Sequence, residues 1–265
     1  MPQDYAASVQ GVAIRVTRLD EDLTLMTGNS DSYTTTAFIR TSFTPEYEEG
    51  DEITEKAADG TVCVSFKAPD TLKRVNMEVA ICEPDPEVSQ LLSGGVLLAG
   101  RPDGSGGTAD PIAMGWASAQ VGEDPSGYGV AVEVWSRAIQ DGKPATENPY
   151  FHWIFPYVKT RLTGDRVIEN GLLATTFEGF GLGNLNFDIG LDGRWRWPEV
   201  TDRPYLYART DYSPVGLKRW YTWDSGTGAS TAHTTLDDPA DGINIPGSDG
   251  YVPPPDYVLN ADWTS

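Results

Sequence analysis

Short runs of alternating apolar and polar residues, separated by glycine and proline, fill the first two thirds of this chain. In residues 11–19 (GVAIRVTRL), Val12, Ile14 and Val16 would fall on one face of an extended strand, with the intervening residues on the other. A period of two residues is typical of a half-buried β-strand. The chain of 265 residues also contains 28 glycines and 19 prolines, which interrupt helices but mark the turns between strands. The pattern predicts a mainly β (α+β) fold.

Further strands are expected along the chain, at residues 33–44, 61–67, 72–82, 128–139 and 150–162. Pro45 is expected to end the first of these strands, and Pro156 inside the last indicates an edge strand or a bulge. Asn170-Gly171 predicts a hairpin within residues 166–180, because both residues tolerate positive φ.

One short helix is expected at residues 85–93. Pro86 stands at a favourable early helical position, Glu87 lies in the first turn, and Gly94-Gly95 would end the helix. The apolar residues that would share its buried face are Val88, Leu91 and Leu92.

The chain divides by composition into a main domain and two extensions. We expect a free N-terminal arm at residues 1–10, a β domain at residues 11–192 and an extension at residues 193–265 that is acidic and rich in Gly, Pro and Asp. Residues 225–265 contain no lysine or arginine and few apolar residues. Such a segment has little apolar surface to offset the entropy cost of ordering. It is therefore expected as an extended arm that orders only on assembly.

The formal net charge of −20 excludes phosphate-neutralising contact with nucleic acid, which needs clustered lysine and arginine. The acids are densest in residues 45–60, where Glu46 to Asp59 holds seven carboxylates and one lysine. We expect this segment to be a long loop between two strands. Long loops in compact domains are often functional, but an acidic loop that serves only solubility is the plain alternative.

Neither a membrane span nor a metal site is predicted. No apolar stretch approaches the roughly 18 to 20 residues that cross a bilayer, and the first ten residues do not resemble a signal peptide, so a cytoplasmic location is expected. Cys63 and Cys82 lie in strand-like runs and are expected as buried, reduced thiols. The chain has only these two cysteines and two histidines, fewer than the usual four zinc ligands would require. No cofactor is expected.

The sequence nominates no catalytic residue. His152 lies in the strand FHWIF, where a structural histidine is expected, and His233 lies in a polar stretch. The glycines of residues 179–183 have the wrong spacing for a dinucleotide loop and indicate a bend or bulge near a strand end. Two alternatives stay open, a carbohydrate-binding β-sandwich and a glycoside hydrolase with paired carboxylates. Tryptophans that could stack on sugars in the first are Trp195, Trp197, Trp220 and Trp223.

Longer strings carry a more specific resemblance. They are ASVQGVAIRVTRLD, FTPEYEEGDEITEKAADGTVCVSFKAPDTLKRVNMEVAICEPDPE, VEVWSRAI and NPYFHWIFPYVKTRLTGDRVIENGLLATTFEGFG. Together, over residues 7–183, they resemble the major tail protein, or tail tube subunit, of long non-contractile-tailed phages that infect actinobacteria.

The resemblance implies a structural virion protein rather than an enzyme. It implies two packed antiparallel sheets with a flanking helix, hexameric rings that stack into a tube, and inner strands that close into one continuous β-barrel. DNA would pass through the lumen during ejection without specific binding. Expected partners are other copies of the chain, the tape-measure protein, the tail terminator, and baseplate or distal tail proteins. The location would be the virion tail, assembled in the host cytoplasm.

The resemblance also assigns contact residues. Its long loop between early strands contacts the neighbouring ring, and the positional match here is residues 45–60. Acids expected in this contact are Glu46, Glu48, Glu49, Asp51, Glu52 and Glu55. Basic partners on the next ring are expected among Arg15, Arg18, Lys73, Arg74, Arg161 and Arg166, although pairing within one subunit is the equal alternative. Expected interface anchors in the C-terminal extension are Trp220, Trp223 and Trp263.

Overall fold

The computed structural model describes residues 6–26, 32–82, 85–100, 112–122, 124, 127–164, 174–187, 202–210, 217–224, 229–235 and 258–259. Over these residues the chain is mostly β, with one short helix, as the sequence predicts. None of the described helical residues forms a segment long and apolar enough to cross a membrane.

One large antiparallel sheet holds nine strands. They are β1 (Ala7–Arg18), β2 (Ser32–Thr35), β3 (Phe38–Glu48), β6 (Thr71–Ile81), β9 (Val130–Gln140), β10 (Lys143–Pro144), β11 (Tyr150–Thr163), β12 (Thr175–Leu182) and β13 (Leu206–Thr210). Small sheets contain β4 (Glu52–Lys56) with β5 (Val62–Lys67), β7 (Val96–Gly100) with β8 (Ile112–Ala117) and β16 (Val258–Leu259), and β14 (Leu217–Asp224) with β15 (Ala229–Thr235). Helix α1 spans Pro86–Ser93.

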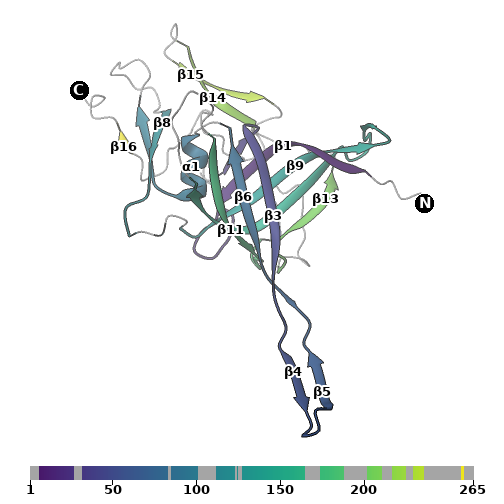
Figure 1. Ribbon diagram of the computed structural model, residues 1–265. Helices are drawn as coiled ribbons and strands as arrows, with labels where there is room; N and C mark the ends of the chain where they lie inside the picture. Colours follow the sequence, from purple (N-terminus) through teal and green to yellow (C-terminus); the bar gives the residue numbers. More distant parts are fainter. Residues whose placement is uncertain are drawn as a thin grey trace.

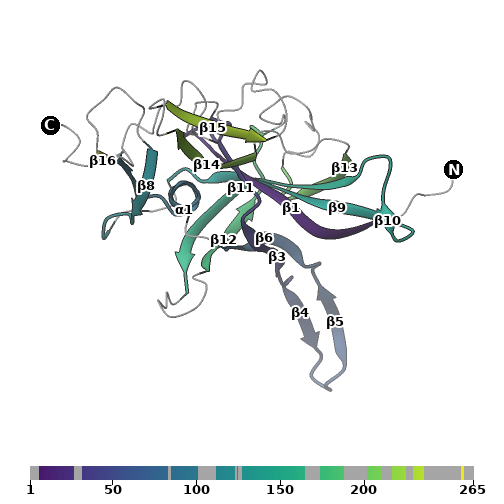
Figure 2. The ribbon, with the colours of Figure 1, turned by 90° about the horizontal axis from the view of Figure 1, so that it is seen from above.

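The large sheet curls until its two ends approach each other (Figures 1 and 2). Its strand order is β2-β1-β9-β11-β12-β6-β3, so β2 and β3 lie at opposite ends although only residues 36–37 separate them in sequence. The Phe43 ring of β3 lies 5.2 Å, between centroids, from the Phe155 ring of β11. The strands expected in two sheets therefore form one continuous sheet whose halves face each other.

The main core fills the inside of this curl. Its fully buried side chains come from five strands and α1, and include Ile14, Val79, Val132, Phe155 and Phe177. Each such side chain contributes about 1.5–3 kcal/mol to folding relative to an exposed position. The apolar alternation in the sequence thus does identify the inward-facing residues.

Helix α1 forms as its sequence signals predict. Asp85 caps the N-terminus by accepting hydrogen bonds from the backbone N–H groups of Glu87 and Val88, and Gly94 ends the helix with a φ of 64°. The Tyr33 hydroxyl also donates to Asp85 over 2.6 Å. The predicted apolar face, Val88, Leu91 and Leu92, is buried in the core.

Strand β1 differs from its prediction in two ways. It starts at Ala7 and pairs with β9 from there, so residues 7–10 are not a free arm; residues 1–5 lie outside the described part. A bulge around Gln10, whose φ is 56°, interrupts the alternation and hides this extension from the sequence pattern. The strand is also not half-buried, because Ala13, Arg15 and Thr17 on its second face are as buried as the core face.

Strand β3 does not end at Pro45. The predicted strand is interrupted at residues 36–37. Strand β3 then runs through Pro45 to Glu48 and pairs with β6 over its whole length. Proline is tolerated because β3 is an edge strand of the described sheet.

Strand β11 confirms one of the two readings of Pro156. The strand lies between neighbours rather than at an edge, and its pairing with β9 shifts register between Phe155 and Val158, which marks a bulge. Its other side pairs with β13 before this point and with β12 after it. Strand β13 lies beyond residue 192, so the sheet continues into the segment expected as an extension.

The turn and first strand of the hairpin predicted within residues 166–180 lie outside the described residues, and the structure shows β11 paired antiparallel with β12. The nearby glycines are not at a bend, because Gly179 and Gly181 lie inside β12. A Cβ at Gly179 would lie 1.9 Å from the carbonyl oxygen of Lys159. Gly179 instead permits close approach of the neighbouring backbone.

The two cysteines are free thiols, as expected, but only one is shielded. Cys82 is half-buried and donates to the carbonyl oxygen of Ala37 over 3.1 Å. Cys63 in β5 is exposed, contrary to the prediction. The reason is that β5 belongs to a hairpin with no core behind it.

Candidate functional site

A two-stranded arm projects from the large sheet, and we define it as residues 47–72. Strands β3 and β6 run beyond the body and continue into β4 and β5 (Figure 1). The segment 45–60, expected as a loop, is therefore mostly strand. Every residue of β4 and β5 is exposed.

The tip of the arm is a turn that its sequence specifies. Gly60 has a φ of 87° and its N–H donates to the carbonyl oxygen of Ala57. Thr61 donates both its hydroxyl and its backbone N–H to Asp59 Oδ1, and these bonds lower the pKa of Asp59. The Asp-Gly signal thus forms a turn that joins two strands of one hairpin.

At the base of the arm, the backbones of its two strands approach each other closely, at residues 50–51 and 68–70. The N–H of Ala68 donates to the carbonyl oxygen of Asp51 over 2.9 Å, and the N–H of Gly50 donates to Asp70 Oδ1 over 3.1 Å. A Cβ at Gly50 would lie 2.0 Å from the carbonyl oxygen of Ala68. Only glycine fits here, so the sequence favours this close approach.

The outer arm has one largely apolar face, on which Glu55 stands opposite Val64, and one polar face. Ile53 stands directly opposite Phe66, and Val64 lies two residues from Phe66 on the same side. Their exposed fractions are 55%, 58% and 52%. We call Ile53, Val64 and Phe66 the apolar face. Residues on the opposite face are Glu52, Thr54, Ser65 and Lys67.

The predicted contact acids fall into two groups. Glu46 lies in β3 and is bound within the subunit: Arg74 Nε donates to it over 2.7 Å, Asn76 donates over 3.0 Å, and Lys73 lies 3.8 Å away. The hydrogen bond from Arg74 is the main cause that lowers the pKa of Glu46. The remaining acids are exposed on the arm, and they are Glu48, Glu49, Asp51, Glu52 and Glu55.

The predicted basic partners do not form one patch. Arg15 is fully buried and paired with Glu133, so it cannot reach another subunit. Lys73 and Arg74 pair with Glu46, as the same-subunit alternative expects. Arg161 is exposed on β11, Arg18 is half-buried on β1, and Arg166 lies outside the described residues.

A buried ionic cluster occupies the second face of β1, β9 and β11. Arg15 Nε and Nη2 donate to the two carboxylate oxygens of Glu133 over 2.6 and 2.9 Å, and His152 Nε2 donates over 3.0 Å. Trp135 stacks on His152 with 4.2 Å between ring centroids. Burial raises the pKa of Glu133, but the Arg15 charge and the bonds from His152 and Arg15 lower it to about 2. His152 is thus structural, as predicted.

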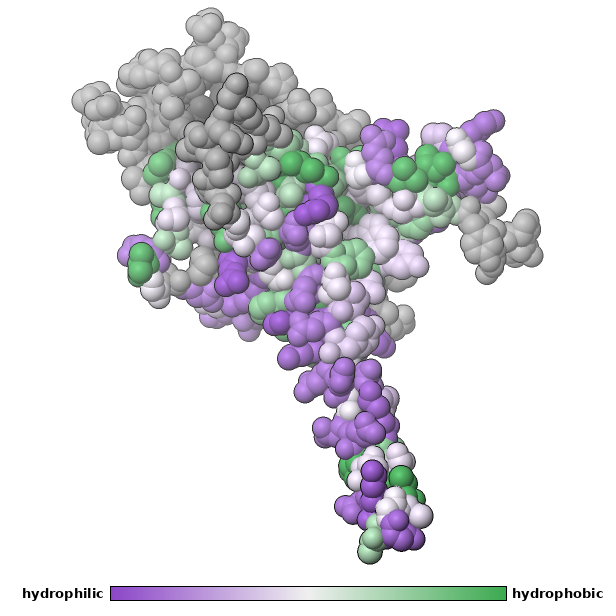
Figure 3. All heavy atoms as spheres, in the orientation of Figure 1, coloured by the Kyte–Doolittle hydropathy of each residue, from purple (hydrophilic) through white to green (hydrophobic). Residues whose placement is uncertain are grey.

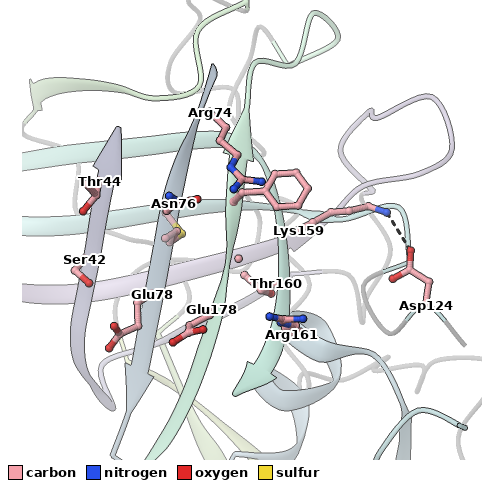
Figure 4. A pocket seen from close by; sticks show the side chains of 13 residues that line it. Ser42, Thr44, Arg74, Asn76, Glu78, Asp124, Lys159, Thr160, Arg161 and Glu178 are labelled. Carbon is pink, nitrogen blue, oxygen red and sulfur yellow. Dashed lines mark hydrogen bonds and ion pairs between the residues drawn. The ribbon is translucent and has the colours of Figure 1, made fainter. Parts of the chain in front are cut away.

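A concave pocket of about 770 Å³ lies on the outer face of β3, β6, β12 and β11 (Figure 4). Glu178 stands between Glu78 and Arg161 in one row across three strands. Glu78 also pairs with Arg40, and Lys159 Nζ lies 3.2 Å from Asp124 Oδ2. Three acidic and three basic side chains line the pocket, which therefore carries little net charge in a strongly acidic chain.

The sequence pattern missed the apolar face of the arm, although its signal is present. Val62, Val64 and Phe66 alternate with polar residues, which agrees with the strand predicted at residues 61–67. Periodicity shows which side chains share a face but not whether anything covers it.

The expected anchors of the extension cannot be placed as side chains. Trp220 and Trp223 lie in β14, which pairs with β15, and Trp263 is outside the described residues. Among the described residues, no group of three or more His, Cys, Asp or Glu side chains is arranged to hold a metal ion.

Comparison with known proteins identifies no relative: no protein-family model matches the chain, and no curated protein matches it.

Proposed function

We propose that this chain is a structural virion protein, the subunit of a phage tail tube, which forms hexameric rings that stack. The observation that carries the proposal is the projecting arm. A two-stranded hairpin is marginally stable in water by itself. This hairpin has an apolar face, and each of its three apolar side chains is more than half exposed to solvent. Such a surface marks an interaction site, and the resemblance over residues 7–183 supplies the partner, a copy of the same chain.

The curled sheet supports the same proposal. Its halves face each other across one core, as in the sandwich-like subunit expected from the resemblance, and α1 packs beside them. The outer edge of β3 has no partner strand among the described residues. An open edge of 11 residues is a template for pairing with another chain. Joining such edges between subunits would produce the continuous barrel of a tube.

The charge supports a role as a conduit. A ring of six chains carries about −120 formal charges, screened beyond about 8 Å at physiological salt. DNA passing through the lumen would meet few phosphate-binding sites. The tape-measure, terminator and distal tail proteins are the further partners in this proposal, and the virion tail is the location.

Electron microscopy and polysaccharide binding separate this proposal from the carbohydrate-binding and hydrolase alternatives. Concentrated wild-type protein should show rings or tubes of uniform diameter in negative stain and should not be retained on polysaccharide columns. A monomer that binds polysaccharide contradicts the proposal and favours a carbohydrate-binding domain.

A further inference from the structure

We propose that residues 49–51 and 68–70 form a joint about which the outer arm swings as one body, and that Asp70 holds its resting angle. These residues lie in the gap between two ladders, the pairing of β3 with β6 in the body and the pairing of β4 with β5 in the outer arm. We call them the joint. This inference goes beyond the proposed function and needs no second copy of the chain.

Few hydrogen bonds cross the joint. Among the described residues, one backbone–backbone bond crosses it, from the N–H of Ala68 to the carbonyl oxygen of Asp51 over 2.9 Å. The other bond depends on a side chain, since the N–H of Gly50 donates to Asp70 Oδ1 over 3.1 Å. A regular antiparallel ladder instead supplies backbone bonds in pairs at every second facing position. The joint is therefore weaker than the ladders on either side of it.

The sequence accounts for this break. The register of the pairs on either side places Gly50 opposite Pro69. Proline fixes its φ at about −65°, whereas an antiparallel strand has a φ of about −140°, so Pro69 bends its strand out of the ladder. Gly50 accommodates the bend, because a Cβ there would lie 2.0 Å from the carbonyl oxygen of Ala68. One strand is thus stiff at the joint, and the other is conformationally permissive.

No other described contact sets the direction of the outer arm. Strands β4 and β5 pack against each other, and none of the described body elements packs substantially against either of them. The space-filling view shows the outer arm clear of the body (Figure 3), and both ribbon views agree (Figures 1 and 2). The angle between the outer arm and the body therefore depends on the joint.

Asp70 is the positioning residue of the joint. Its carboxylate binds the backbone of the opposite strand at Gly50, so this bond links the two strands. Asp70 Oδ1 also lies 3.9 Å from Lys67 Nζ, but Lys67 is on the same strand, so this pair does not cross the joint. Both side chains are about half exposed, and such surface pairs contribute little. Loss of the bond to Gly50 should therefore release the outer arm, whereas loss of the charge pair should not.

Pulsed electron paramagnetic resonance measures the swing in dilute, monomeric protein. One spin label is placed on the exposed native Cys63 and one on Glu178→Cys in the body, with Cys82→Ser to leave no other thiol. Cys63 lies about 20 Å beyond the joint at about 3.3 Å per residue, so a swing of about 20° moves its label by about 7 Å. A pair within the body, Lys143→Cys with Glu178→Cys and without native thiols, gives the width that the labels alone produce.

The distribution of arm–body distances should be broader in the otherwise wild-type chain than the distribution of the body pair. Asp70→Ala should broaden it further, and should make the N–H of Gly50 exchange with water about fivefold faster, because a hydrogen bond of ordinary strength is lost. Asp70→Asn keeps an acceptor oxygen without the charge and should keep the wild-type width. Pro69→Ala frees the backbone to continue the ladder, and should narrow the distribution.

An arm–body distribution as narrow as that of the body pair would overturn the joint. Equal widths for Asp70→Ala and the wild-type joint, or an Asp70→Asn distribution as broad as that of Asp70→Ala, would overturn the role of Asp70. Cross-strand nuclear Overhauser effects between β4 and β5 should persist in every variant, and their loss would mean that the outer arm melts rather than swings. Because each measurement is made on the monomer, failure of the joint leaves the proposed function standing, and a chain that forms no tubes leaves the joint standing.

Discussion

Replacing Glu133 by glutamine tests the buried ionic cluster. The change leaves the side-chain shape nearly intact but removes the charge that faces Arg15 over 2.6 Å. The lowering of the Glu133 pKa from 4.5 to about 2 corresponds to about 3 kcal/mol, since each pKa unit is worth about 1.4 kcal/mol. Removing one partner of a buried ion pair typically lowers the free energy of unfolding by about 3–5 kcal/mol. We expect Glu133→Gln to lower the free energy of unfolding by about 3 kcal/mol at pH 7.

The pH dependence gives the sign of the effect. Because the folded pKa lies below the unfolded value, the stabilisation is fully present above about pH 4.5 and is lost as pH falls toward 2. About 2 kcal/mol of it should be gone by pH 3. The difference between wild type and Glu133→Gln should therefore shrink over this range.

Urea unfolding between pH 7 and pH 3, followed by tryptophan fluorescence, measures both quantities. Glu178→Gln on the exposed outer face of β12 is the control and should change stability little. A Glu133→Gln variant as stable as wild type at pH 7, or a difference that stays constant down to pH 3, would refute the reasoning.

Two further substitutions test local packing by urea unfolding. Asp85→Ala removes the cap of α1 and the acceptor of the Tyr33 hydroxyl, and should cost about 2 kcal/mol or more, whereas Asp85→Asn should cost less; equal losses would contradict the capping role. Gly179→Ala places a methyl group against the Lys159 carbonyl oxygen and should cost about 1–3 kcal/mol. Gly115→Ala, where a Cβ meets only Leu98 at 3.5 Å, should be nearly neutral, and a similar loss for both would contradict the clash.

Features with local signals were predictable from the sequence. The cap, the apolar face and the glycine stop of α1 lie within ten residues, and the alternation in β9 is continuous. Both were predicted nearly to the residue. Pro156 likewise indicated a bulge at its own position, because proline has no backbone N–H to donate to a neighbouring strand.

Features that depend on distant strands were not predictable. Pro45 does not end β3 because that strand is at the edge of the sheet, and edge position is a property of the whole topology. Arg15 was expected to pair either with the next ring or within its own subunit. Arginine is rarely buried without a partner, and the partner here, Glu133, is 118 positions away in the sequence. The acidic segment was expected as a loop for a different reason: β4 contains one apolar residue, Ile53, and so lacks the alternation of a half-buried strand.

The measurement that tests the central claim most directly is rotational averaging of electron micrographs of the purified, concentrated wild-type chain. The account predicts rings with six-fold symmetry that stack into tubes of uniform diameter. A monodisperse monomer at every concentration, or assemblies without a closed ring, would contradict it.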